Sequence, residues 1–195
     1  NKLLIYGTTG FTGKLIASKA KQLGFDVVLA ARNQKQLATQ ARELDLPSLC
    51  IALTDTQALD DALQDCTAVL NVAGPFAQTA EPMIEACLRT RTHYLDVAGE
   101  MSAFLAAQKY SDAAAQHNVM LMPGAGFVIA PSDCLALHMK QRMPDAHYLR
   151  IGLSRIDLFS RGTLRAMMGL VAPYVYIRRH GRVTTVPVGR LEWHF

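Results

Sequence analysis

Leu3-Leu4-Ile5-Tyr6 runs directly into Gly7-Thr8-Thr9-Gly10-Phe11-Thr12-Gly13, and this stretch decides the fold. A short apolar segment is typical of a buried strand, and here it ends at a segment with glycine at every third position. In such a unit Gly7 permits the tight turn, Gly10 lets backbone approach a phosphate group, and Gly13 lets helix and strand pack closely. Unpaired amides and the helix dipole favour negative charge at the helix start. The stretch therefore predicts a phosphate-binding turn between a first strand and a first helix.

Further short apolar segments follow, each separated from the next by a stretch long enough for a helix. Short apolar segments that alternate with helical stretches are typical of a parallel sheet buried on both faces. The predicted strands are Leu3–Tyr6, Val27–Ala31, Ser48–Ala52, Ala68–Val72, His93–Val97 and Val119–Met122. We predict an α/β fold over residues 1–122, a doubly wound parallel sheet of the Rossmann type with about six strands.

Five helices are predicted between these strands. The first is amphipathic, with Leu15, Ile16, Ala20 and Leu23 on one side and Lys14, Lys19 and Lys21 on the other. Asn33 and Asp55 are good N-cap residues for the second and third helices, and Pro82 is placed in the first turn of the fourth. The predicted bounds are about Phe11–Leu23, Asn33–Leu44, Asp55–Asp65, Glu81–Arg89 and Ser102–Gln116.

The pattern changes after Met122, where a turn-rich segment, Pro123–Phe127, begins. Residues 123–195 are predicted to be an incomplete α+β domain, and an Arg179-His180-Gly181 turn indicates a hairpin near its end. The predicted elements are a helix Pro131–Met143, a strand Tyr148–Leu153, a helix Thr163–Leu170 and two hairpin strands, Tyr174–Arg178 and Arg182–Val188.

Composition excludes several classes of protein. With 195 residues, 50% hydrophobic and 18% charged, the chain is neither disordered nor fibrous. Its apolar segments are far shorter than a membrane span, which needs about 18 residues. No signal segment is visible at Asn1, so we expect a cytoplasmic protein without a membrane span. The spacing of the cysteines fits neither a metal site nor a disulfide framework, and each is expected to be a buried free thiol: Cys50, Cys66, Cys87 and Cys134.

The net charge of +4 is unevenly distributed. Residues 146–195 contain 8 arginines and only two acidic residues, Asp157 and Glu192. These arginines are dispersed and lack the interleaved lysine and aromatic residues of a nucleic-acid surface, so no nucleic-acid partner is predicted. An anionic small-molecule substrate, or an acidic surface outside this chain, is the expected partner of this charge.

The end of the second strand favours one dinucleotide over another. An NAD site has an acidic residue there for the ribose hydroxyl, whereas this chain has Arg32-Asn33 and no acid before Glu43. A guanidinium pairs well with a 2′-phosphate, so Arg32 and Asn33 predict NADP; the alternative is a solvated arginine at a helix start. The ends of the third and fourth strands are expected beside the adenine and the nicotinamide, and the latter segment is otherwise a simple turn. The cofactor residues predicted there are Leu53, Thr54, Val72, Ala73, Gly74 and Pro75.

Four motifs in this order resemble the saccharopine dehydrogenase-like oxidoreductases, which include saccharopine reductases and trans-acting enoyl reductases. The motifs are Tyr6–Lys14, Ala31–Asn33, Asn71–Phe76 and Tyr94–Glu100, and the similarity continues through Gly126-Phe127, Pro131–Asp133, Ser160–Thr163 and Arg179–Arg182. The resemblance implies an NADP-binding Rossmann domain followed by a catalytic and dimerisation domain, hydride transfer at an imine, ketone or enoyl group, and a homodimer through the second domain. Related enzymes continue well beyond Phe195, so this chain is expected to be the front part of a longer enzyme.

Two departures from that family concern the substrate. Thr8 stands where alanine is common, and Val128-Ile129-Ala130 replaces a more polar segment. The second change predicts a more apolar wall, and so an acyl or polyketide-like substrate rather than an amino acid.

The catalytic residues are less specific. Asp96 and Glu100 follow the fifth strand, where open α/β sheets bind ligands, and either is a candidate acid or base; helix capping is the alternative for Glu100. No Tyr-x-x-x-Lys pair of a short-chain dehydrogenase is present at Tyr6 or Tyr110. A sensor or scaffold that binds NADP without turnover is the second hypothesis. Candidate substrate contacts are Phe127, Arg161 and Thr163, for which an ordinary N-cap turn at Arg161 and Thr163 is the alternative.

Overall fold

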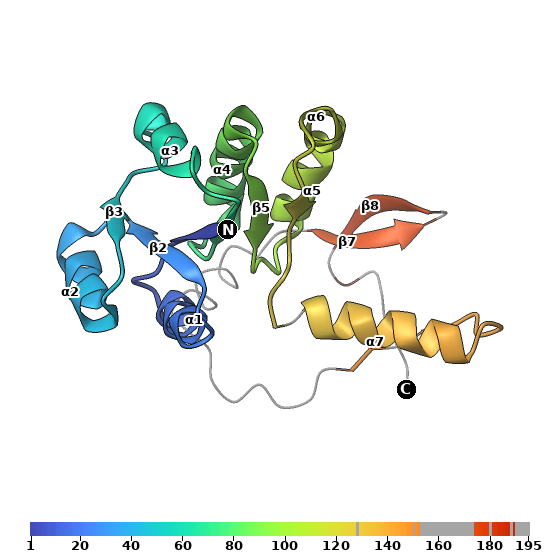
Figure 1. The fold of residues 1–195 in the computed structure, drawn as a ribbon. Coiled ribbons are helices and arrows are strands. Elements are labelled where there is room, and N and C mark those ends of the chain that lie inside the picture. The colour runs from blue at the N-terminus through green and yellow to red at the C-terminus, as the bar shows by residue number, and fades with distance from the viewer. Residues whose placement is uncertain (128, 150, 153–173, 180, 188, 190–195) are drawn as a thin grey trace. The chain divides into compact units, whose positions relative to one another are not determined.

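The computed structural model describes residues 1–127, 129–149, 151–152, 174–179, 181–187 and 189 (Figure 1). The chain falls into two compact units, residues 1–157 and 158–195. The predicted domain boundary at residue 122 stays a prediction. None of the helices that the structure describes combines the length and apolar character needed to cross a membrane.

The first unit contains a parallel sheet of six strands in the order β3-β2-β1-β4-β5-β6. This is the order of a doubly wound dinucleotide-binding sheet, so the predicted fold class is confirmed. The strands are β1 Lys2–Tyr6, β2 Asp26–Ala31, β3 Ser48–Cys50, β4 Ala68–Asn71, β5 His93–Asp96 and β6 Leu121–Met122.

The strands end earlier than predicted at one edge of the sheet. β3 stops at Cys50 rather than Ala52 because β2, the one strand it pairs with in the described sheet, stops at the paired Ala31. β4 and β5 likewise end together at the pair Asn71 and Asp96. The carboxyl ends of the strands therefore form one level edge, from which the chain leaves as loops.

Seven helices connect or follow these strands in the described residues. Asn33 and Asp55 act as N-caps as predicted, because their side-chain oxygens accept hydrogen bonds of 3.1 Å from the Gln36 and Ala58 amides. The helices are α1 Phe11–Gln22, α2 Gln34–Leu44, α3 Thr56–Leu63, α4 Phe76–Thr90, α5 Met101–Lys109, α6 Ser111–His117 and α7 Ile129–Arg142.

The predicted start of the fourth helix is wrong. α4 begins at Phe76 instead of Glu81, so Pro82 lies inside it rather than in its first turn. A proline removes one backbone hydrogen bond from a helix. Burial of Phe76, Ala80 and Met83 along one face of α4 holds the helix together across that position.

The predicted single helix Ser102–Gln116 is divided at Tyr110 into α5 and α6. At this break the Tyr110 hydroxyl donates to Glu81 at 2.9 Å and Glu85 at 2.6 Å, both on α4. The hydrogen bond to Glu85, partial burial and the hydrogen bond to Glu81 raise the pKa of Tyr110 to about 12. The break therefore joins the α5–α6 segment to α4 through one phenol.

α1 packs on the sheet through small residues and not through its leucines. Gly13, Ala17 and Ala20 are buried and Ile16 packs partly buried against the core, so the predicted face is right at Ile16 and Ala20 and wrong at Leu15 and Leu23, which are exposed. The close approach at Gly13 fixes which side of the helix meets the sheet. Two apolar clusters form the core, one with α1 and α2 residues Ala17, Ala20 and Leu37, the other with α3, α4 and α5.

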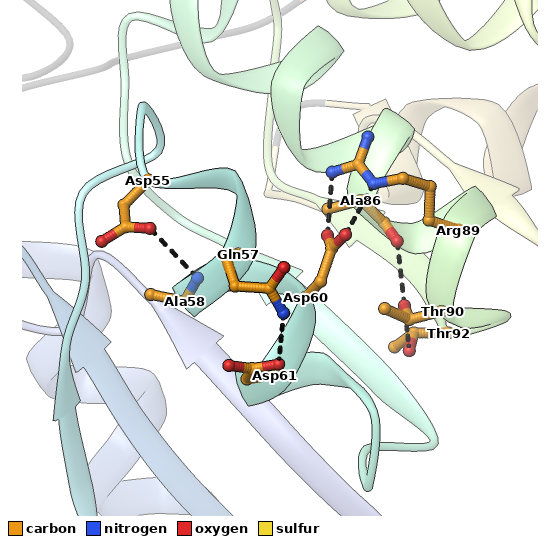
Figure 2. A network of polar contacts seen from close by, with 9 residues as sticks. All are labelled: Asp55, Gln57, Ala58, Asp60, Asp61, Ala86, Arg89, Thr90 and Thr92. Atoms are coloured by element: carbon orange, nitrogen blue, oxygen red, sulfur yellow. Dashed lines mark hydrogen bonds and ion pairs between the residues drawn. The ribbon is translucent and has the colours of Figure 1, made fainter.

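The side of the domain away from the level edge is held by polar contacts between α3, α4 and the start of β5 (Figure 2). Arg89 donates to both carboxylate oxygens of Asp60, at 2.7 and 2.8 Å. Thr92 is fully buried, and its hydroxyl donates to the Leu63 carbonyl at 3.0 Å and contacts the Thr90 hydroxyl at 2.9 Å. These bonds fix the C-terminal ends of α3 and α4 against each other.

The predictions for α7 and for the chain after it are confirmed in part. α7 begins at Ile129, two residues before the predicted start at Pro131, so Pro131 lies in the first turn of the helix. The predicted strand Tyr148–Leu153 is wrong at its described residues, since residues 148, 149, 151 and 152 are exposed and belong to no strand. The predicted helix Thr163–Leu170 lies outside the described residues. The hairpin is confirmed as β7 Tyr174–Arg179 and β8 Arg182–Pro187, with Gly181 at φ +78° in the turn.

The cysteines are free, and only two of them match the expected burial. Cys66 and Cys87 are buried, and burial raises the pKa of each thiol. Cys50 and Cys134 are exposed, because β3 is an edge strand and α7 has no buried residue in the described structure.

Candidate cofactor site

The candidate site lies along the carboxyl ends of the six strands. β1 is followed by the glycine-rich turn and α1, while its neighbour β4 is followed by Val72–Pro75 and α4 (Figure 1). The direction of strand order reverses between β1 and β4, and a crevice at such a reversal binds ligands in open α/β sheets. The glycine-rich turn, Arg32 and Val72–Pro75 directly follow β1, β2 and β4, three neighbouring strands, at this edge of the sheet. That they form one cofactor site stays a prediction.

The three glycines of the turn have different roles. Gly7 has φ +92° and donates to the Ala30 carbonyl at 2.7 Å, and a Cβ there would lie 2.8 Å from the Ala73 nitrogen. A Cβ at Gly13 would lie 2.4 Å from the Gly7 carbonyl oxygen. A Cβ at Gly10 would meet that oxygen only at 3.4 Å. The protein itself thus requires glycine at positions 7 and 13, whereas the space beside Gly10 could accept a methyl group at ordinary contact distance.

The start of α1 presents backbone donors. Gly10 is its N-cap and has no side chain to accept a hydrogen bond, and the first helical bond runs from the Lys14 amide to the Gly10 carbonyl at 3.0 Å. The amides of Phe11, Thr12 and Gly13 thus have no acceptor within the helix. Phe11 is 70% exposed, so the turn is open to solvent. These amides and the helix dipole suit a phosphate group.

Thr8 is an unusual residue for this turn. It is fully buried, and its hydroxyl has no hydrogen-bond partner in the described structure. A buried polar atom without a partner is unfavourable by about 1–3 kcal/mol. The hydroxyl therefore lowers the free energy of unfolding of the protein without cofactor.

Replacing Thr8 with valine tests this directly. Thr8→Val keeps the side-chain shape and removes the unpartnered hydroxyl, so we expect unfolding in urea to require about 1 kcal/mol more. Thr9→Val, at the neighbouring half-buried position, is the control and should change stability by less than about 0.5 kcal/mol. A lower stability of Thr8→Val would show that the hydroxyl has a partner in the folded protein.

The end of β2 presents a cation without a neighbouring acid. Arg32 is exposed, and Asn33 next to it uses its side-chain oxygen to cap α2. No ion pair involves Arg32 among the residues that the structure describes. At the end of β3, Leu53 is half-buried and Thr54 is exposed. The ends of the neighbouring strands β2 and β3 are therefore followed by an exposed guanidinium and a half-buried leucine.

The end of β4 is held by side chains. The Asn71 side-chain oxygen accepts from the Ala73 amide at 3.1 Å, and the Thr79 hydroxyl donates to the Ala73 carbonyl at 2.7 Å. Val72, Ala73 and Pro75 are half-buried and Gly74 is exposed, so this segment is partly open to solvent at the edge of the sheet.

Asp96 lies at this edge as predicted, but its side chain is fully buried. Its carboxylate accepts from the Tyr94 hydroxyl at 2.7 Å and from the Ala98 and Gly124 amides at 2.8 Å each. Burial, and then the charge of Asp96, raise the pKa of Tyr94. The carboxylate thus joins the loops after β5 and β6.

Glu100 caps a helix, but not the helix that it precedes. Its carboxylate accepts from the Ala77 amide of α4 at 3.1 Å and makes no cap hydrogen bond to α5. An acidic group is favourable at a helix N-terminus. Glu100 is half-buried at the same edge as Val72–Pro75.

The predicted substrate residues are either exposed or outside the described part of the chain. Phe127 is 85% exposed, and Arg161 and Thr163 lie outside the described residues. Asn71, Thr79 and Tyr94 belong to the edge and were missed as site residues by sequence reasoning. A polar residue that ends an apolar strand, as Asn71 does, is the signal that points to such a role.

Comparison with known proteins identifies the family. The family described as saccharopine dehydrogenase NADP-binding domain matches residues 3–122, which span the sheet from the second residue of β1 to the end of β6. The chain belongs to this family. The predicted resemblance is confirmed, and NADP is the cofactor of this domain.

Relatives of the domain extend the comparison. The saccharopine dehydrogenase-like oxidoreductase of Bos taurus is 27% identical over 161 residues, which are 72% of this chain and 38% of that protein. A trans-acting enoyl reductase of Mycobacterium ulcerans is 25% identical over 181 residues, or 89% of this chain and 43% of that protein. The chain thus spans about two fifths of the length of these relatives.

Among solved structures, the apo L-glutamate-forming saccharopine dehydrogenase of Saccharomyces cerevisiae has a similar fold. It matches with a TM-score of 0.64 and 16% identity over 73% of this chain and 31% of that one. At this identity the similarity supports the fold of the NADP-binding domain.

Proposed function

We propose that this NADP-binding domain is part of an NADP(H)-dependent oxidoreductase that transfers hydride to or from an imine, ketone or enoyl substrate. The observation that carries the proposal is the start of α1, where a glycine turn presents amides without a helical acceptor, next to the strand β2 whose end carries Arg32, an arginine without an ion pair among the described residues. Relatives named oxidoreductase and enoyl reductase support the reaction class.

Different residues at this edge bind different parts of the cofactor in this proposal. The amides at the start of α1 bind the pyrophosphate, Arg32 with Asn33 binds the 2′-phosphate, and Leu53 with Thr54 flanks the adenine. Val72–Pro75 lies on the nicotinamide side. NADPH, when bound, supplies a hydride to an electrophilic carbon, and the matching proton has to come from a side chain or from water.

Glu100 is the carboxylate that we propose for proton transfer. It is half-buried at the edge beside Val72–Pro75, whereas the buried Asp96 has no exposed surface. Phe127, Arg161 and Thr163 are the proposed substrate contacts. The apolar segment Val128-Ile129-Ala130 supports an acyl or polyketide-like substrate. A homodimer through the predicted second domain, residues 123–195, and a cytoplasmic location are parts of the same proposal.

A sensor that binds NADP without turnover is the second candidate. It is favoured by the hydrogen bond between Glu100 and the Ala77 amide, which occupies the proposed acid or base in a structural role. A panel of enoyl, keto and imine compounds separates the two functions, because an enzyme consumes NADPH with at least one class of compound. Tight NADPH binding without consumption across the panel would favour the sensor.

Arg32 is expected to determine the preference for NADP. Arg32→Ala removes a charge-assisted pairing of about 1.5–3 kcal/mol, so NADPH should bind about 10- to 100-fold more weakly while NADH binding changes less than about twofold. The fluorescence of the bound nicotinamide measures both affinities. Arg42→Ala, an exposed arginine near the other end of α2, is the matched control. An Arg32→Ala variant that keeps the preference for NADPH would contradict this assignment.

A further inference from the structure

The segment Val72–Pro75 is fixed from inside the sheet at one residue. Ala73 has both of its backbone polar groups engaged by side chains, its amide by Asn71 and its carbonyl by Thr79. Asn71 also donates to the Thr79 hydroxyl at 3.2 Å, so the two side chains that hold Ala73 hold each other. Ala73 therefore has little freedom to move relative to β4.

Asn71 is connected in turn to the end of β5. Its side-chain nitrogen lies 3.5 Å from the Tyr94 hydroxyl, which donates to Asp96 at 2.7 Å. Asn71, Tyr94 and Asp96 are all fully buried. The register of β4 and β5 places Asn71 opposite Asp96, so the connection is a direct result of strand pairing.

The position of Ala73 matters for the crevice because Ala73 touches the glycine-rich turn. A Cβ added to Gly7 would lie 2.8 to 2.9 Å from three Ala73 atoms. The space beside the Gly7 Cα is therefore too small for a methyl group, because Ala73 packs against the glycine, and a movement of Ala73 away from it would open a gap. Asn71 and Thr79, which fix Ala73, thus set the spacing between the glycine-rich turn after β1 and the segment Val72–Pro75 after β4.

We propose that Asn71, Tyr94 and Asp96 form a positioning network that sets the affinity for the nicotinamide half of the cofactor without touching it. The inference rests on the proposed NADP function, because Val72–Pro75 flanks the nicotinamide in that proposal. The adenosine half is bound by the α1 amides and Arg32, which make no hydrogen bond to this network in the described structure. Loss of the network should therefore weaken one half of the site selectively.

Tyr94→Phe in the full chain tests the proposal. The variant removes the hydroxyl that joins Asn71 to Asp96 and keeps the buried ring. We expect NADPH to bind about 5- to 10-fold more weakly, and 2′,5′-ADP, which lacks the nicotinamide half, to bind within about twofold of wild type. Nicotinamide fluorescence measures NADPH binding, and displacement of NADPH measures binding of 2′,5′-ADP.

Tyr110→Phe is the matched control, because the Tyr110 hydroxyl also bonds carboxylates in this unit, Glu81 and Glu85. It should leave the ratio of the two affinities unchanged. If Tyr94→Phe folds poorly, Thr79→Val replaces it: the variant removes the bond to the Ala73 carbonyl at a half-buried position and should weaken NADPH about threefold with 2′,5′-ADP unchanged.

The possible results separate the two proposals. Wild type that binds neither NADPH nor 2′,5′-ADP would overturn the proposed function itself. Wild type that binds both, together with variants in which both affinities fall equally or neither falls, would overturn the positioning network and leave the NADP function intact. A selective loss for NADPH in Tyr94→Phe or Thr79→Val, absent in Tyr110→Phe, supports the network.

Discussion

Gly13→Ala should abolish NADPH binding and destabilise the domain by about 3 kcal/mol. Its Cβ would lie 2.4 Å from the Gly7 carbonyl oxygen and 2.6 Å from the Thr8 Cα. Both contacts are with backbone, which cannot rotate away as a side chain can. Either α1 moves off the sheet or the turn after β1 changes, and each movement removes the amides from the pyrophosphate position. Urea unfolding and NADPH fluorescence measure the two effects.

Two other glycines serve as controls for Gly13→Ala. Gly10→Ala places its Cβ 3.4 Å from the Gly7 carbonyl oxygen, so the fold should survive while the methyl group obstructs the pyrophosphate and weakens NADPH at least tenfold. A Cβ at Gly99 meets nothing within 4 Å, so Gly99→Ala should change neither property. Equal stability of Gly13→Ala and Gly99→Ala would disprove the steric argument.

Asp96→Ala should destabilise the domain by about 3–5 kcal/mol. The change leaves three donors without an acceptor, the Tyr94 hydroxyl and the amides of Ala98 and Gly124, in a site that excludes water. Asp96→Asn keeps one side-chain oxygen for the two amides and should be less destabilising, by about 1–2 kcal/mol. Urea unfolding followed by circular dichroism measures each difference.

Asp61→Ala is the control for the loss of a carboxylate. Asp61 accepts one hydrogen bond, from Gln57 on the same exposed helix face, and its removal should change stability by less than about 0.5 kcal/mol. If Asp96→Ala were as stable as Asp61→Ala, the amides of Ala98 and Gly124 would have to find other acceptors. The role of Asp96 as the link between two loops would then be wrong.

The sheet could be predicted from the sequence because each strand is a short apolar segment between helical stretches. The caps at Asn33 and Asp55 are likewise local, since the residue type and its distance from the helix decide them. The start of α4 and the break at Tyr110 depend on burial of Phe76 and on carboxylates of another helix. Such tertiary contacts leave no mark within the segment itself.

The candidate site shows the same division. The turn Gly7–Gly13 and Arg32 are predictable because one short motif and one position contain the chemistry. The link between Asn71 and Tyr94 joins residues far apart in sequence, and only the register of β4 and β5 brings them together. The contact of Glu100 with α4 could not be predicted for the same reason, because Glu100 and Ala77 are 23 residues apart in the sequence.

The single carboxylate shared by two loops has a consequence for how this edge of the domain opens. Asp96 binds the amides of Ala98 and Gly124 with one side-chain oxygen, and its own carbonyl accepts from Ala125. We expect the two loops to open together as one unit of local unfolding, because both lose a hydrogen bond when Asp96 moves. A ligand that holds either loop should then slow hydrogen exchange in both.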